Sequence, residues 1–139
     1  MFNTGTRVLF KRTPVTHALD GFYKALARIE PDGGTRITAG LTAAAELMRH
    51  APPRTRRRVV LLSDGADGGS AIPVATSMKE DGCIIDVIGI GGCPAAVGEA
   101  YLRELASVVG GCTRYRFIAD KDTLLSHFAS IATDIMCVR

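Results

Sequence analysis

The chain has 139 residues, of which 47% are hydrophobic and 22% are charged, and its formal net charge is +3. This length corresponds to one domain that can bury a core, and the composition excludes an intrinsically disordered protein. The charge is too small to imply a nucleic-acid or membrane partner by itself, and no apolar run approaches the roughly 18 residues of a membrane-spanning helix. We therefore expect a single domain over residues 1–139, with no nucleic-acid or membrane partner.

The first segment, MFNTGTRVLFKR, has no long apolar stretch before a cleavage site, so a signal peptide is not expected. The four cysteines, Cys83, Cys93, Cys112 and Cys137, form no C-x-x-C pair, which removes support for zinc or thioredoxin-type chemistry. Cys83 opens an apolar run, and we expect buried free thiols in a reducing compartment. The predicted location is the cytoplasm.

In chain order, the first predicted element is a short strand over Arg7–Lys11, followed by a helix over residues 16–29 with apolar residues on one face. A turn with the sequence PDGGT leads into a second helix, predicted from about Arg36 to His50. The small residues of this helix would let it lie close to a sheet. Prolines at positions 52 and 53 end it.

Three continuous apolar runs in the rest of the chain predict strands that are covered on both faces. They are Val59–Ser63, Cys83–Ile90 and Tyr115–Ile118. Because predicted helices separate them, the strands should be parallel neighbours in one sheet. The predicted fold class is α/β, a doubly wound and mainly parallel sheet with helices on both faces.

The helices between these strands are predicted over Ile72–Glu80, with Pro73 in the first turn, and over Glu99–Val109. Asp122 is predicted to cap a last helix. Five apolar side chains are expected on the inner face of that helix: Leu124, Leu125, Phe128, Ile131 and Ile135.

Candidate ligand-binding residues follow from the fold class, because ligands of open parallel sheets lie beyond the carboxyl ends of the strands. The loop SDGAD follows the strand Val59–Ser63, and the sequence GGT at residues 33–35 opens a helix. Their carboxylate and hydroxyl oxygens suit Mg²⁺ or Mn²⁺. Taken alone, Asp64 has a second interpretation, in which it accepts backbone N–H bonds and caps its own loop.

Two segments, GGTRITAGL and VVLLSDG, are the most specific parts of a resemblance that extends from Phe2 to about Ile135. The chain resembles the von Willebrand factor A-type (vWA) family, whose fold is Rossmann-like. The resemblance implies that Thr35 and Asp64 belong to the second and third segments of a metal-ion-dependent adhesion site. They would bind Mg²⁺ or Mn²⁺, directly or through water, and the cation would take an acidic group from a protein partner.

The family's first metal segment, Asp-x-Ser-x-Ser, does not occur ahead of Arg7. The resemblance therefore implies an N-terminally truncated domain that lacks the first strand, the first helix and most of the second strand. A site made of Thr35 and Asp64 alone would bind metal weakly. Without the first strand, Val59–Ser63 would become an exposed sheet edge, through which we expect self-association.

The function expected from this resemblance is protein–protein interaction, metal-assisted or metal-independent, and not catalysis. The pattern is most similar to vWA domains of plant RING-finger proteins, but no RING cysteine pattern is present, so ligase activity does not carry over. Two alternatives stay open: an incomplete or inactive fragment without a binding role, and a subunit of a metal-chelatase complex.

Two other patterns carry little weight. The sequence VIGIGGCPAAVG follows a strand, but Pro94 occupies the third glycine position of a dinucleotide fingerprint. Basic residues cluster between Arg49 and Arg58. We interpret them as a solvated loop at the end of the sheet opposite the predicted metal site.

Overall fold

The computed structural model describes most of the chain. The described residues are 1–2, 5–9, 13–14, 21, 24–25, 27–28, 34–65, 67 and 70–137. Their elements are α2 (Ile37–Arg49), β1 (Arg57–Ser63), α3 (Ile72–Glu80), β2 (Cys83–Ile90), the 3₁₀ helix η1 (Pro94–Val97), α4 (Glu99–Leu105), β3 (Val108–Val109), β4 (Cys112–Thr113), β5 (Tyr115–Ile118) and α5 (Lys121–Cys137). Within this part of the chain, no helix has the length and apolar character needed to cross a membrane.

The central sheet has three parallel strands in the order β1-β2-β5. β1 pairs with β2 along its whole length, and the second half of β2 pairs with β5. The prediction of three parallel neighbours is therefore confirmed, although β1 begins at Arg57, two residues earlier than predicted. Among the described residues β1 forms one edge of this sheet, as expected for Val59–Ser63.

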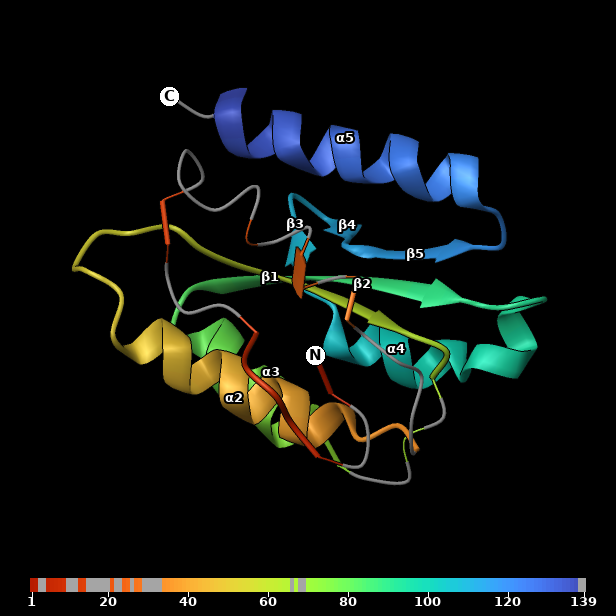
Figure 1. Ribbon diagram of the computed structural model, residues 1–139, viewed down its shortest axis with the longest axis horizontal. Coiled ribbons are helices and arrows are strands. Elements are labelled where there is room, and N and C mark those ends of the chain that lie inside the picture. The colour runs from red at the N-terminus through yellow and green to blue at the C-terminus, as the bar shows by residue number, and fades with distance from the viewer. Residues whose placement is uncertain are drawn as a thin grey trace.

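Helices cover both faces of the sheet, as predicted. α2, α3 and α4 lie on one face and α5 lies on the other (Figure 1). Along β2, Ile85 and Val87 belong to the core beneath α2, α3 and α4, whereas Ile88 belongs to the core beneath α5. All three residues have a relative exposure of 0%. The continuous apolar run of β2 is thus explained by burial on alternate faces.

The predicted helix over Glu99–Val109 is too long, because α4 ends at Leu105. Ser107 binds the edge of β2 instead: its N–H donates to the carbonyl of Ile85 at 2.9 Å, and its Oγ accepts from the N–H of Ile85 at 2.9 Å. The residues after Ser107 form the small hairpin of β3 and β4. Its turn is Gly110-Gly111, whose φ angles of 59° and 79° favour glycine.

The cap of α5 also differs from the prediction. α5 begins at Lys121, and the carboxylate of Asp120, not that of Asp122, accepts a hydrogen bond from the N–H of Thr123 at 2.8 Å. This bond lowers the pKa of Asp120 below its usual value. An acid two residues earlier than predicted therefore caps the first turn of α5.

Only part of the predicted inner face of α5 is covered. Ile131 is buried and Leu124 packs against the same core, but Leu125 is 57% exposed and Phe128 is 36% exposed. Leu124 and Ile131 are seven residues apart and share one line along the helix, whereas Leu125 is rotated by about 100° from Leu124. The side chain of Ile135 lies outside the described part.

Most of the residues for which N-terminal elements were predicted lie outside the described part of the chain. The first three residues of the predicted strand Arg7–Lys11 form no strand, and the rest of that segment is outside, as is most of the predicted helix over residues 16–29. Phe2 and Thr6 instead form an isolated antiparallel bridge.

The cysteines fit the prediction in part. Cys83 is free and buried, and burial raises the pKa of its thiol. Cys93 and Cys112 are free but exposed, because they lie in the loop after β2 and in the β3–β4 hairpin. The side chain of Cys137 is outside the described part.

An ion pair joins the amino end of β1 to the middle of β2. Nε and Nη2 of Arg58 donate to the two carboxylate oxygens of Asp86 at 2.5 and 3.0 Å. The side chains are 14% and 5% exposed, so the basic run is not entirely a solvated loop. Hydrogen bonding to Asp86 raises the pKa of Arg58. Asp134 of α5 lies 3.8 Å from Arg58 and 3.2 Å from Arg114, but it is 54% exposed.

Replacing Asp86 by asparagine should lower the free energy of unfolding by about 3 kcal/mol, because Arg58 would remain charged and largely buried without its carboxylate. The matched control is Asp134→Asn, which removes an exposed carboxylate from the same cluster and should cost less than about 1 kcal/mol. Urea denaturation of the two variants measures both values. Equal losses would contradict the role assigned to Asp86.

Candidate metal-binding site

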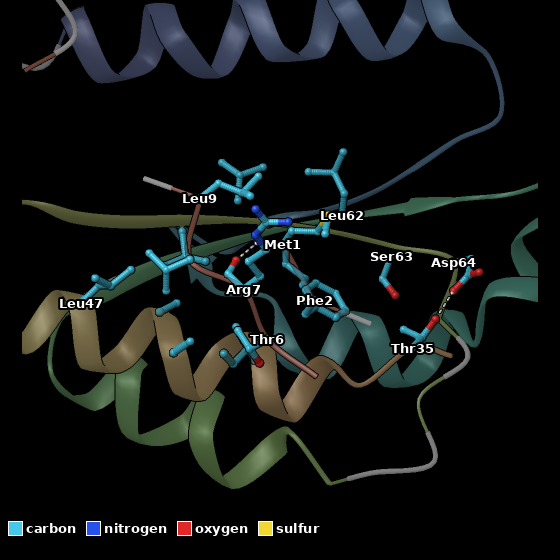
Figure 2. A pocket seen from close by; sticks show the side chains of 18 of the residues that line it. Met1, Phe2, Thr6, Arg7, Leu9, Thr35, Leu47, Leu62, Ser63 and Asp64 are labelled. Atoms are coloured by element: carbon cyan, nitrogen blue, oxygen red, sulfur yellow. Dashed lines mark hydrogen bonds between the residues drawn. The ribbon is translucent and has the colours of Figure 1, made fainter. Parts of the chain in front are cut away.

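Thr35 and Asp64 meet at the carboxyl end of β1. Thr35 lies two residues before α2 begins, and Asp64 follows the last residue of β1. The Oγ1 hydroxyl of Thr35 donates to Oδ1 of Asp64 at 3.3 Å (Figure 2). Asp64 is exposed and Thr35 is half-buried, so solvent reaches the pair. The prediction that these two residues approach each other is confirmed.

The loop that carries Asp64 is held by its neighbours. The N–H of Gly65 donates to Oγ of Ser63 at 3.1 Å. Ser63 thus accepts a backbone N–H bond of the kind that the second interpretation assigned to Asp64. Gly65 has a φ of 84°, and a Cβ at this position would lie 1.5 Å from the carbonyl oxygen of Val97 in η1. Only glycine fits this backbone, because both the conformation and the contact exclude a side chain.

Asp67 connects this loop to α2. Its Oδ2 accepts a hydrogen bond from the N–H of Thr38 at 3.2 Å, and its own N–H donates to the carbonyl of Gly65 at 2.9 Å. The first N–H groups of a helix have no partner within the helix and carry partial positive charge. The N-cap position, Arg36, provides no side-chain bond. Asp67 therefore caps α2 and ties together the two segments that carry Thr35 and Asp64.

Asp67 belongs to the predicted ligand loop SDGAD, but its role as the cap of α2 is not predicted from the sequence. The signal was present, because the helix after GGT starts at an arginine and lacks a capping side chain of its own. Helices of this kind need a capping group from elsewhere. The sequence alone did not indicate which of the nearby acidic residues would reach the helix.

The donor set fits a hard divalent cation. A hydroxyl and a carboxylate oxygen are ligands of Mg²⁺ and Mn²⁺, which take about six oxygens. The described residues contain no group of three or more His, Cys, Asp or Glu side chains arranged around a metal position. A cation at Thr35 and Asp64 would thus hold several water molecules, and these positions are open to an incoming group.

Sequence comparison supports one family. The model of the von Willebrand factor type A domain matches residues 1–130. A curated relative, calcium-activated chloride channel regulator 1 of Sus scrofa, is 32% identical over 115 residues, which cover 78% of this chain and 12% of the relative. The chain thus spans about a tenth of the length of the curated relatives it matches.

Solved structures show the same fold. One of them is proximal thread matrix protein 1 from the mussel byssus, with zinc in its metal-ion-dependent adhesion site (MIDAS) motif. It superposes with a TM-score of 0.74 at 21% identity, over 98% of this chain and 35% of that one. The manganese-loaded TRAP protein of Plasmodium vivax gives a TM-score of 0.57 at 22% identity, over 79% and 45%. Because the family model covers most of the chain and the folds agree, the chain belongs to the von Willebrand factor type A domain family.

Proposed function

We propose that this domain binds a protein partner through a divalent cation held by Thr35 and Asp64, and that it is not an enzyme. The observation that carries the proposal is the 3.3 Å contact between the Thr35 hydroxyl and the Asp64 carboxylate at the open edge of the sheet. The partner would supply an acidic group, because a carboxylate completes the coordination of a cation to which the described residues offer two side chains.

Mg²⁺ or Mn²⁺ is the proposed cation. Both prefer oxygen ligands, and Mg²⁺ commonly keeps several waters when a protein offers one or two carboxylates. Two structural relatives support metal binding at this kind of site, since one carries zinc in its MIDAS motif and the other is loaded with manganese. With two side chains from this chain, we propose weak binding that a partner carboxylate strengthens.

Binding of Mn²⁺ should be lost or weakened at least 10-fold, about 1.4 kcal/mol, when Asp64 is replaced by asparagine, because the charge is removed while the shape is kept. Isothermal titration measures the affinity. The control is Asp81→Asn, which neutralises an exposed aspartate at the end of α3, ahead of β2, away from the rim. If Asp64→Asn and the parent bind Mn²⁺ equally, the domain works without metal at this site.

Replacing Asp67 by alanine should weaken Mn²⁺ binding a few-fold and also lower stability by about 1 kcal/mol, because the first turn of α2 loses its cap. Titration and thermal melting report the two effects separately. Asp64→Asn provides the contrast, because it should lose affinity without losing a helix cap. A variant at position 67 that melts earlier but binds Mn²⁺ normally would limit Asp67 to a structural role.

A further inference from the structure

The face of the sheet beneath α5 has an apolar half and a charged half. Toward the carboxyl ends of the strands it carries Ile88, Ile90 and Ile118, which form or pack against the core beneath α5. Toward the amino ends it carries Arg58 and Asp86, because side chains two residues apart in a strand face the same way. α5 begins after β5 and runs back over this face, antiparallel to the strands (Figure 1). The helix therefore covers both halves.

One line of residues along α5 faces this surface. Leu124 and Ile131 belong to the core beneath the helix, and His127 lies between them, three residues after the first and four before the second. Residues at these spacings share one side of an α-helix. His127 is half-buried, whereas its sequence neighbours Ser126 and Phe128 are exposed. His127 therefore lies on the side of α5 that faces the sheet.

Among the described residues, three charged side chains of the sheet act on His127. Arg116 lies on β5, two residues before Ile118 and therefore on the same face. Arg58 of β1 and Asp86 of β2 pair with each other. The α5 residues three or four positions from His127 are uncharged: Thr123, Leu124, Ser130 and Ile131. A proton on His127 therefore adds a positive charge opposite two arginines and a carboxylate that is already bound.

The docking of α5 rests on a narrow set of described contacts. Ile131 is buried and Leu124 is half-buried. Further along the helix, Asp134 lies 3.2 Å from Arg114 and 3.8 Å from Arg58. The carboxylate of Asp134 is exposed, and ion pairs of exposed groups stabilise a protein weakly. One added charge beneath the helix is therefore large in relation to the contacts that hold it.

The environment of His127 sets the direction of the effect of pH. Burial lowers the pKa of His127 most, the charge of Arg116 lowers it further, Asp86 opposes this change and Arg58 adds to it. The docked helix therefore holds the proton less tightly than a released helix does. A group whose pKa is depressed in the folded state stabilises that state above the unfolded pKa, and this contribution is lost as the pH falls. Docking of α5 should thus weaken below a pH of about 6.5, the ordinary pKa of histidine.

We propose that His127 is a pH-sensitive latch of α5: protonation of its ring, which faces Arg116 and Arg58, releases the helix from the sheet under mildly acidic conditions. The step transfers one proton from solvent to the ring and breaks no covalent bond. It uncovers the sheet face beneath α5, where Ile88 and Ile118 are buried. The latch does not involve the candidate metal site, so it holds or fails independently of the proposed function.

Amide hydrogen exchange of the 139-residue chain at pH 7.5 and 5.5, corrected for the intrinsic effect of pH, measures the opening of α5. We expect exchange in α5 to become about 3- to 10-fold faster at pH 5.5. The ceiling is about 11-fold, because a free histidine then has about ten protonated molecules for each neutral one. At both pH values α5 should exchange at least about 10-fold faster than β2, because the helix opens while the sheet stays folded.

Substitutions identify the group that titrates. His127→Gln removes the titrating ring and should reduce the change between the two pH values to less than about 2-fold. His50→Gln is the matched control and should respond like the parent, because His50 is an exposed histidine at the end of α2. Arg116→Gln removes a repelling charge and should respond less than the parent. Its control is Arg49→Gln, which removes an exposed arginine of α2 and should respond like the parent.

Three outcomes would overturn the proposal. One is a full response to pH in His127→Gln or, if that variant does not fold, in Arg116→Gln. Another is equal exchange rates in α5 and β2, because the helix would then open only when the whole domain unfolds. The third is a pKa of His127 at or above about 6.5 in an NMR titration of the ring, because protonation would then not weaken the docking of the helix.

Discussion

The two-sided burial of β2 is the constraint on which the rest of the described domain depends. Its backbone pairs with β1 on one side and with β5 on the other, and its side chains enter two separate cores. Asp86 in the same strand holds Arg58 of β1. A shift of β1 by one residue would send its side chains to the wrong faces. The register that pairs Ser63 with Gly89 also decides where β1 ends, and therefore where Asp64 lies.

The sequence predicted those elements whose cause is local or periodic. The strands β2 and β5 and the helix α3 have the predicted bounds, because continuous apolar runs and Pro73 mark them. The end of α4 could not be predicted in this way. It depends on Ser107, whose bonds to Ile85 cross 22 residues. The exposure of Leu125 on α5 likewise depends on how much of the helix the neighbouring sheet covers. The periodicity of apolar residues does not predict how wide that covered face is.

The candidate site also has a part that could be predicted from the sequence and a part that could not. Thr35 and Asp64 could be placed from the sequence, because parallel strands end at one edge and each residue adjoins a recognisable helix or strand. The bond from Thr38 to Asp67 could not, because it needs the distance between a loop and a helix that are 29 residues apart. The contact between Gly65 and Val97 is of the same kind. Contacts that position a site are thus less visible in the sequence than the residues that form it.

The cap that Asp67 places on α2 has a thermodynamic consequence. The loop after β1 holds the amino end of α2, and the same loop holds a candidate cation ligand, so ordering either part lowers the cost of ordering the other. Such coupling is reciprocal: if an intact cap raises the affinity for a cation by some factor, the bound cation stabilises the cap by the same factor. Ile37 in the first turn of α2 is buried beneath the sheet. A cation bound by Thr35 and Asp64 would therefore also stabilise the packing of this turn against the core. If a cation binds there, the fraying of this helix end and the affinity for the cation are two measures of a single equilibrium.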